Sequence, residues 1–263
     1  MSDPVLISID NHVATVTLNR PEKANAVSLA MFDALAAAGS EIAANRSVRA
    51  VVLHGAGDNF CAGIDTGIFQ DPSFDFGESA MAPVDDSPAN RFQSAAYAWR
   101  ECPVPVICAI QGVAFGAGLQ IALGADIRYA RPDVTLSIME IKWGLIPDMA
   151  ISTTLRDLVP ADRVKELAWT GRTFDAREAL SMGLITEVHD DPLAAAMEVA
   201  NEIRVKSPDA IRAMKQLVVR GWSLPDSEAL ALEAKLQLGV MGKKNQLEAV
   251  MANLQKRAPN FDD

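Results

Sequence analysis

The sequence predicts an α/β fold, and two observations support that prediction. An apolar run of strand length over 106–110 is followed by a glycine-rich turn (112–118) and a mostly apolar helix that stops at Gly124. A second apolar run over 48–53 also leads into a glycine-rich turn, over 54–65. Strand-length runs that alternate with helical patterns are typical of an α/β protein.

The first two predicted strands form a β-hairpin. Residues 5–9 and 13–18 alternate apolar with polar side chains on either side of the dipeptide at 10–11. A helix should then begin after Ser28, a good N-terminal cap, because apolar residues recur behind it at helical spacing. These residues are Leu29, Phe32, Leu35, Ala36 and Ile42.

The same two periodicities predict the later elements of the α/β part. Helices are predicted over 91–101, 164–169 and 176–182, and strands over 126–129, 134–138 and 184–188. The segment 71–90 is rich in Pro, Ser, Gly and Asp and has no period, so it should be a long loop. Such a loop is either a flap beside a ligand site or a tolerated surface insertion.

From about residue 191 onward the pattern is continuously helical. Apolar residues follow helical spacing at Leu247, Val250, Met251 and Leu254, and an earlier helix is marked by Leu230, Ala234 and Val240. These helices have apolar faces but no strands, so they must pack on the α/β part or on another subunit. We therefore expect an α/β core over 1–195 and a C-terminal helical oligomerisation segment over 196–263.

Composition and charge exclude several classes of protein. The 263 residues are 49% hydrophobic and 22% charged, which is typical of a soluble globular chain. The formal charge of −10 argues against nucleic acid or an anionic membrane surface as the main partner. We find no basic leader with an apolar run and no apolar stretch of membrane-spanning length, so we expect a cytoplasmic protein.

Cysteine and histidine spacing predicts neither a disulfide framework nor a metal site. The cysteines, Cys61, Cys102 and Cys108, lack CxxC spacing, and the histidines, His12, His54 and His189, are scattered along the chain. The turn GAGDNF (55–60) follows a strand as a dinucleotide-binding turn would. Phe60, however, stands where that motif needs its third glycine.

The two glycine-rich turns suggest a chemistry. Glycine lets the backbone approach a ligand closely, and the N–H groups at the start of a helix have no partner within the helix. Two such donors facing one carbonyl oxygen would stabilise negative charge on it, because they need not reorient as the charge develops. An arrangement of this kind lowers the barrier to forming an enolate.

Five short strings in order along the chain resemble the crotonase family of enoyl-CoA hydratases and isomerases. They are NRPEKANA (19–26), FCAGID (60–65), IQGVAFGAGLQ (110–120), ADIRYA (125–130) and EIKWGLIPD (140–148). Each string is weak alone, but five in the right order are highly specific. The resemblance covers essentially the whole chain and implies a spiral of ββα units. It also implies that the C-terminal helices pack between the subunits of a homotrimer or a hexamer of paired trimers.

The resemblance further implies how an acyl-CoA thioester is bound. The oxyanion-hole amides fall on Ile64 and Ala117. Contacts to coenzyme A fall on Lys23, Ala24, Ala26, Ala62, Asp65, Ile68, Phe115 and Gly116, and on Lys256 and Arg257 of a neighbouring subunit. The cations among them are how an acidic protein could hold an anionic ligand. Coenzyme A is part of the substrate, so no separate cofactor and no metal are expected.

The candidate catalytic residues depart from the hydratase pattern. Hydratases of the family position water with two glutamates, whose positions hold Gln120 and Glu140 here. An amide can orient water but cannot carry a proton back and forth at neutral pH. Isomerases that shift a 3-enoyl bond use the second glutamate alone. Dienoyl-CoA isomerases add an aspartate eight residues later, which falls on Asp148, but they also carry an acid at the Gln120 position.

Each candidate also has a purely structural interpretation. Glu140 could be an exposed strand carboxylate paired with Lys142. Asp148 could cap the helix that follows it, and Gln120 could be a satisfied core amide. Trp143 fits the core or the wall of an acyl pocket.

The sequence favours an acyl-CoA double-bond isomerase that works through a thioester enolate. A hydratase is the first alternative, and a catalytically idle acyl-CoA-binding subunit is the second. The carboxylates should have raised pKa values if the pocket is as apolar as its neighbouring residues suggest. These neighbours are Ile138, Met139, Trp143 and Leu145.

Overall fold

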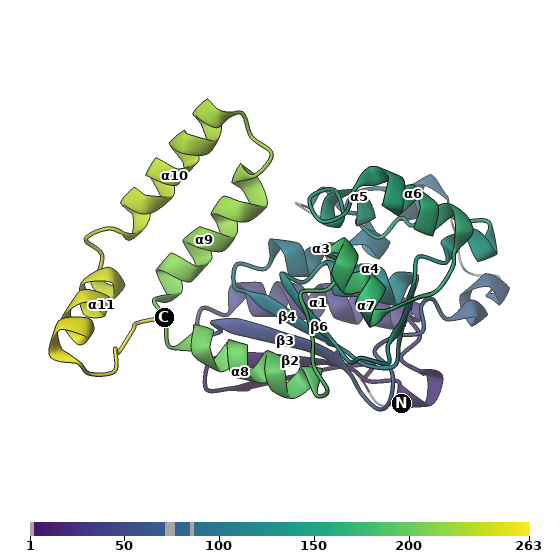
Figure 1. Cartoon of the computed structure of the whole chain (residues 1–263), viewed down its shortest axis with the longest axis horizontal. Coiled ribbons are helices and arrows are strands. Elements are labelled where there is room, and N and C mark those ends of the chain that lie inside the picture. Colours follow the sequence, from purple (N-terminus) through teal and green to yellow (C-terminus); the bar gives the residue numbers. More distant parts are fainter. Residues whose placement is uncertain (1–2, 72–76, 85–86) are drawn as a thin grey trace.

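The computed structural model describes residues 3–71, 77–84 and 87–263, and a six-stranded sheet lies at its centre (Figure 1). Its strands are β1 (Val5–Asp10), β2 (Val13–Leu18), β3 (Ala50–Gly55), β4 (Val106–Ile110), β6 (Ile127–Ala130) and β9 (Glu187–Val188). They lie in the order β1-β2-β3-β4-β6-β9. The β1–β2 hairpin is antiparallel and the other neighbouring pairs are parallel. The predicted α/β class is therefore confirmed.

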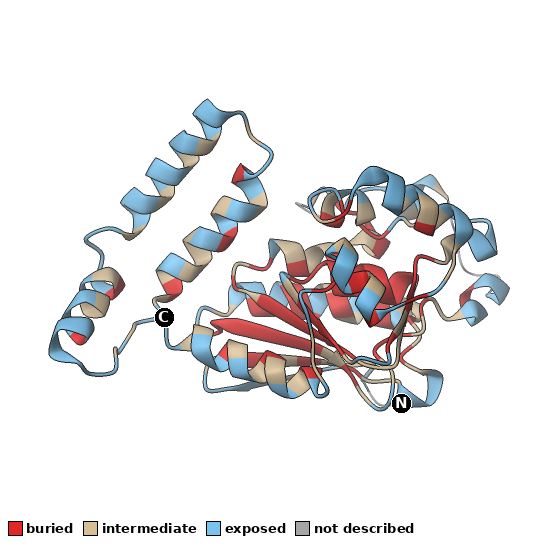
Figure 2. Ribbon diagram, in the orientation of Figure 1, coloured by how far each residue is buried: buried red, intermediate tan, exposed pale blue. Residues whose placement is uncertain are grey.

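Helices cover both faces of this sheet. The side chains of β3 alternate, so that Val51 and Leu53 enter the larger core while Ala50 and Val52 face the other side. The larger core contains α1 (Leu29–Ala44) and α3 (Arg91–Glu101), and α8 (Pro192–Arg204) packs on the opposite face. Burial on both faces explains why the parallel strands have continuous apolar sequences (Figure 2).

A second, three-stranded sheet includes one strand, β5, in the segment that the sequence predicted to be only a glycine-rich turn. It is formed by β5 (Val113–Phe115), β7 (Thr135–Ser137) and β8 (Phe174–Asp175). The prediction of a simple turn over 112–118 was therefore wrong. A three-residue strand is too short to display its period, and Gly112 and Gly116, both with positive φ, flank it.

The remaining elements of the body are short. They are the 3₁₀ helices η1 (Pro21–Lys23), η2 (Thr66–Gln70) and η3 (Glu140–Trp143) and the α-helices α2 (Glu78–Met81), α4 (Ala117–Leu123), α5 (Ile151–Thr154), α6 (Ala161–Thr170) and α7 (Ala176–Met182). Ser28 caps α1 as predicted, because its hydroxyl accepts from the Met31 N–H. Of the loop predicted over 71–90, residues 72–76 and 85–86 lie outside the described residues, and the rest includes α2.

Three C-terminal helices extend away from this body (Figure 1). They are α9 (Pro208–Gly221), α10 (Asp226–Val240) and α11 (Lys244–Gln255). The Lys215 ammonium of α9 anchors them by donating to Asp126 at 2.7 Å and to the Trp99 and Val104 carbonyls at 3.0 Å. The boundary predicted between 195 and 196 falls inside α8, which packs on the sheet. The chain leaves the body only after that helix.

No helix within the described ranges is long and apolar enough to cross a membrane. The same ranges contain no group of His, Cys, Asp and Glu residues placed to hold a metal ion. The three cysteines are buried free thiols.

Candidate active site

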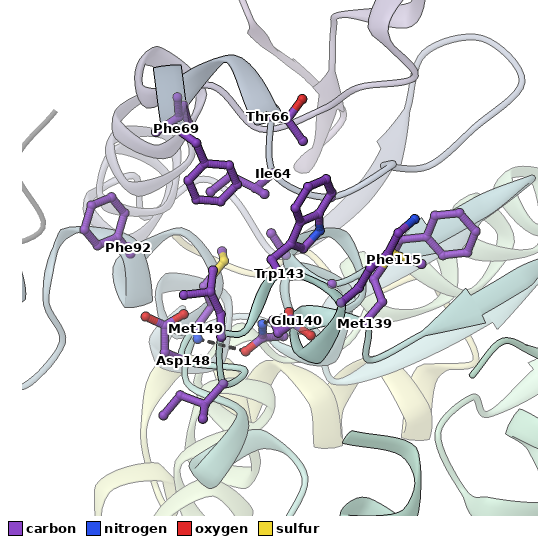
Figure 3. A pocket seen from close by; sticks show the side chains of 18 of the residues that line it. Ile64, Thr66, Phe69, Phe92, Phe115, Met139, Glu140, Trp143, Asp148 and Met149 are labelled. Atoms are coloured by element: carbon purple, nitrogen blue, oxygen red, sulfur yellow. Dashed lines mark hydrogen bonds between the residues drawn. The ribbon is translucent and has the colours of Figure 1, made fainter. Parts of the chain in front are cut away.

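A pocket of about 360 Å³ lies among α1, α3, α4, η2 and η3 (Figure 3). Its lining is mostly apolar. The polar and charged side chains that reach it belong to Thr66, Gln120, Glu140, Lys142 and Asp148. An apolar pocket with a few converging polar groups is typical of a small-ligand site.

Strand pairing brings the two predicted backbone donors to one wall of this pocket. Cys61 pairs in parallel with Ala114, so the segments that follow these two residues run in the same direction. Ile64 and Ala117 each lie three residues beyond this pair (61 + 3 and 114 + 3). Both line the pocket. The register thus places the two residues next to the same cavity, although they are far apart in sequence.

The N–H groups of these two residues are not used by the fold. Val27 hydrogen-bonds to the Gly63 carbonyl at 2.8 Å and to the Asp65 N–H at 3.0 Å, so the Ile64 N–H points away from Val27. Ala117 is the first residue of α4, where an N–H has no helical acceptor. Within the described part of the chain, neither N–H donates a hydrogen bond. Both can therefore bind a ligand oxygen.

Two glycines make this close packing possible. Gly63 (φ 96°) lies so near β5 that an added Cβ would be 2.9 Å from the Phe115 carbonyl oxygen. Gly116 (φ 48°) precedes Ala117, and a Cβ there would be 3.1 Å from Glu140 Oε1. Only glycine combines these positive φ angles with such close neighbours.

Glu140 is the first residue of η3, and its two carboxylate oxygens differ. Oε1 accepts a 2.6 Å hydrogen bond from the Gln120 amide, whereas Oε2 is buried and has no partner within the described residues. Loss of solvent raises the pKa of Glu140 above its ordinary value, and the negative charge of Asp148 raises it further. The interpretation of Glu140 as an exposed strand carboxylate is therefore wrong.

Gln120 is both a satisfied buried amide and a wall of the pocket. Its Oε1 accepts from the Met149 N–H at 2.8 Å while its Nε2 donates to Glu140. The two interpretations of Gln120 are thus compatible. Met149 also fixes the orientation of the amide, because a flipped Gln120 would set its NH₂ against the Met149 N–H and its oxygen against a carboxylate.

Asp148 lines the pocket and does not cap a helix. The next helix, α5, begins at Ile151 behind Ala150, which has a positive φ, and no side chain caps it. Capping was therefore the wrong interpretation. Loss of water on the pocket side raises the pKa of the Asp148 carboxyl above its ordinary value. In Figure 3 Asp148 and Glu140 lie beside the same cavity.

The residues predicted to contact coenzyme A divide into two groups. Ala62, Ile68, Phe115 and Gly116 line the pocket. The other four lie outside it, on or beside the part of the pocket wall that residues 62–64 form: Lys23, Ala24, Ala26 and Asp65. The Ala62 N–H donates to the Ala24 carbonyl at 2.9 Å, and Asp65 forms a 2.9 Å ion pair with Arg20. Lys23 is exposed at the end of η1, next to this wall.

Lys256 and Arg257 do not approach the pocket of their own chain. They follow α11, at the opposite end of the molecule from α4 (Figure 1). Arg257 forms two hydrogen bonds with Glu248, so its charge is already paired. If these cations contact coenzyme A, they do so on a neighbouring subunit.

Sequence reasoning missed several pocket residues. Phe32 was placed on the inner face of a helix, and Phe92 lay within another predicted helix, but neither was expected beside the ligand. Met81 of α2 and Phe69 of η2 also line the cavity, and Met149 contributes the backbone donor that holds Gln120. The only signal was helical spacing, which shows that a side chain faces inward but not whether the space there is filled.

Comparison with known proteins agrees with this arrangement. The family model described as Enoyl-CoA hydratase/isomerase matches residues 8–263. Enoyl-CoA hydratase EchA19 of Mycobacterium tuberculosis is 31% identical over 269 residues, which cover 98% of this chain and 96% of that protein. The mitochondrial Delta(3,5)-Delta(2,4)-dienoyl-CoA isomerase of Mus musculus is 31% identical over 264 residues, which cover 95% of this chain and 79% of that protein.

Solved structures extend the likeness to the fold. An enoyl-CoA hydratase from Bacillus anthracis superposes with a TM-score of 0.88 at 29% identity, and the match covers 98% of both chains. The relatives include enzymes named for hydration and for isomerisation. With the family model matched over nearly its whole length, this chain belongs to the crotonase family of enoyl-CoA hydratases and isomerases.

Proposed function

We propose that this enzyme is a double-bond isomerase that moves the 3-ene or 3,5-diene of an acyl-CoA toward the thioester. One observation supports this choice above the others. The acid that a hydratase needs at position 120 is an amide, and that amide is hydrogen-bonded between the Met149 N–H and Glu140. One oxygen of Glu140 is thereby held, and Oε2 remains for proton transfer.

The first step would be removal of a proton from C2 of the substrate. The thioester oxygen would lie between the N–H groups of Ile64 and Ala117, which stabilise the negative charge of the enolate. Glu140 Oε2 would take the proton as the C2–H electron pair moves into the C1–C2 bond. The raised pKa of Glu140 brings its basicity nearer to what this step needs.

The second step would return a proton farther along the chain. For a 3-enoyl substrate the proton is added at C4, two carbons from where it was removed, and Glu140 alone can serve both positions. For a 3,5-dienoyl substrate the proton is added at C6, which calls for a second acid. Asp148 lines the same pocket, and partial loss of water there raises its pKa, so it is the candidate for this second acid.

Hydration is the weaker candidate. Adding water requires one group to remove a proton from water and another to protonate carbon, and Gln120 can do neither. Its oxygen is also already occupied by Met149. A protein that binds acyl-CoA without catalysis is also a weaker candidate, because Glu140 Oε2, buried and without a partner among the described residues, belongs to a side chain that lines the pocket where the proton would be transferred.

The part of the predicted oligomerisation segment that follows α8, residues 205–263, would provide the contacts between subunits of a trimer or hexamer. Its helix α10 has no buried residue, and several large apolar side chains on α10 and α11 are exposed: Leu230, Leu238, Leu247, Val250, Met251 and Leu254. Lys256 and Arg257 would then meet the coenzyme A of a neighbouring subunit.

The function can be tested with three thioesters: a 2-enoyl-CoA, a 3-enoyl-CoA and a 3,5-dienoyl-CoA. Wild type should isomerise the second and third and hydrate the first only slowly. Glu140→Gln should lower kcat for both isomerisations by about 10³-fold or more. Asp148→Asn should impair the dienoyl reaction alone. Fast hydration by wild type would contradict the proposal, and binding without turnover of any thioester would favour a non-catalytic subunit.

A further inference from the structure

One part of the pocket lining is apolar and takes no part in the proposed proton transfers. Phe32 of α1, Ile68 of η2, Met81 of α2 and Phe92 of α3 contribute side chains to the lining there. In Figure 3 Phe92 lies on the same side of Glu140 as Asp148, and Phe115 lies on the other side. A chain that passes Glu140 and then Asp148 is therefore directed toward Phe92.

Two aromatic rings lie in this part of the lining. Phe32 and Phe92 pack edge to face, with ring centroids 5.2 Å apart and an interplanar angle of 84°. Phe32 is 1% exposed and Phe92 is 7% exposed, so both rings are held inside the protein. The helices that carry them, α1 and α3, pack against each other in the larger core. The Phe32 and Phe92 rings cannot move aside easily, because core side chains are close-packed.

The charges that reach the pocket are unfavourable for an anionic chain end. Of the three charged side chains that the described part of the chain contributes to the lining, two, Glu140 and Asp148, are acids. The third, Lys142, lies on the exposed side of η3 with its ammonium 5.8 Å from the centre of the Trp143 ring. Among the described residues that line the pocket, no cation accompanies Phe32 and Phe92. A carboxylate at the end of the acyl chain would be desolvated there without a partner.

We infer that the pocket takes the coenzyme A thioester of an uncharged hydrocarbon chain and that Phe92 sets the longest chain it admits. This inference rests on the proposed function in one respect only, that this pocket holds the acyl part of the substrate. Phe92 is the more informative of the two rings, because Phe32 is buried more deeply and its loss would disturb the core.

The test is a homologous series of straight-chain 3-enoyl-CoA thioesters with wild type, Phe92→Ala and Phe115→Ala. For wild type, kcat/KM should rise by about fourfold per methylene while the chain fits, and then fall. Phe92→Ala should move the maximum to chains longer by roughly two to four methylenes, the volume that the lost ring frees. Phe115→Ala deletes an identical ring on the other side of Glu140, so it should change kcat/KM by the same factor for every chain length.

Binding of saturated acyl-CoA thioesters, measured by calorimetry, separates this inference from the proposed reaction. The same shift in preferred length should appear in Kd, and a thioester with a terminal carboxylate should bind about tenfold or more weakly than its methyl-ended analogue. If the length preference shifts in binding while no thioester is turned over, the isomerase proposal fails and this inference stands.

An unchanged length preference in a folded Phe92→Ala variant, or equal binding of the terminal carboxylate, would overturn the inference while leaving isomerisation intact. If Phe92→Ala does not fold, Phe92→Leu should give a smaller shift in the same direction. The absence of that shift would count equally against the inference.

Discussion

The pocket and the C-terminal helices both leave large apolar side chains exposed, but they differ in what lies beside those side chains. Around the pocket, Trp143 and Ile146 are 46% and 77% exposed. On α10 and α11, Leu238 and Leu254 are 74% and 75% exposed. Within the described residues, the pocket also contains unpaired polar atoms, namely the Ile64 and Ala117 N–H groups and Glu140 Oε2, whereas no buried side-chain nitrogen or oxygen of α10 or α11 lacks a partner.

This difference distinguishes a small-molecule site from a protein-binding surface. Unpaired donors and a buried carboxylate oxygen cost stability unless a ligand uses them, so they indicate a polar reacting group such as a thioester. Exposed apolar side chains without such groups gain most from another apolar protein surface. The predictions below alter one property at a time, in order of decreasing expected effect.

Removing a single backbone donor should have the largest effect. Ala117→Pro deletes the N–H at the first position of α4, where helices tolerate proline and where no hydrogen bond of the fold is lost. We expect kcat to fall by about 10²- to 10³-fold, the usual cost of losing one oxyanion donor. Steady-state kinetics with a 3-enoyl-CoA would measure this.

Ala117→Gly is the matched control, because it keeps the N–H and removes only a methyl group. It should remain close to wild type in kcat. If the proline variant, with an unchanged circular dichroism spectrum, is as active as the glycine variant, the Ala117 N–H does not bind the thioester oxygen.

Replacing the amide at position 120 should have an intermediate effect. In Gln120→Glu one carboxylate oxygen would accept from Met149, and the other would face Glu140 Oε1 across the distance now spanned by a 2.6 Å hydrogen bond. Two carboxylates so close must share a proton. We expect isomerisation to fall by about tenfold, and hydration of a 2-enoyl-CoA to rise by about tenfold or more because a second acid is now present.

Loss of absorbance of the 2-enoyl thioester would follow the hydration. Gln120→Met, which removes the hydrogen bond without adding an acid, should lower isomerisation and give no hydration. If the glutamate variant hydrates no faster than wild type, the amide is not what prevents addition of water.

Placing charges on the exposed surface of α10 and α11 tests whether this surface binds another subunit. The double substitution Leu238→Asp and Leu254→Asp should reduce the assembled mass to that of a monomer in sedimentation analysis, because a charge buried at an interface is costly. KM should rise by up to about fivefold if cations near the end of α11 reach a neighbouring site. Leu6→Asp, on the 44% exposed Leu6 of β1, should change neither mass nor KM.

The sequence was sufficient to predict the class of fold, and the two residues predicted to supply backbone donors line the pocket. Resemblance to the crotonase family indicated Ile64 and Ala117, and the structure gives a local reason for these positions, because Gly63 and Gly116 permit the close backbone packing beside them. Whether Asp148 caps a helix or faces the pocket could not be predicted, because that depends on where α5 begins. Phe92 could not be predicted either, since an inward-facing ring looks the same in sequence whether it meets a core or a cavity.

The smallest expected effect is on the pH dependence of the reaction, and its sign follows from the two carboxylates. Glu140 must be ionised to accept a proton, so activity is lost as the pH falls through its pKa, which desolvation and then the charge of Asp148 raise above the ordinary value. Asp148→Asn removes that charge, and the acid limb of kcat/KM for a 3-enoyl-CoA should therefore move to lower pH. It should still lie above the limb expected for an ordinary glutamate, because desolvation, the larger cause, remains.

Asp133→Asn makes the same change in net charge at the exposed Asp133, which pairs with Arg131, and should leave the limb in place. A limb that does not move in Asp148→Asn, or that moves equally in both variants, would mean that the two pocket carboxylates do not interact.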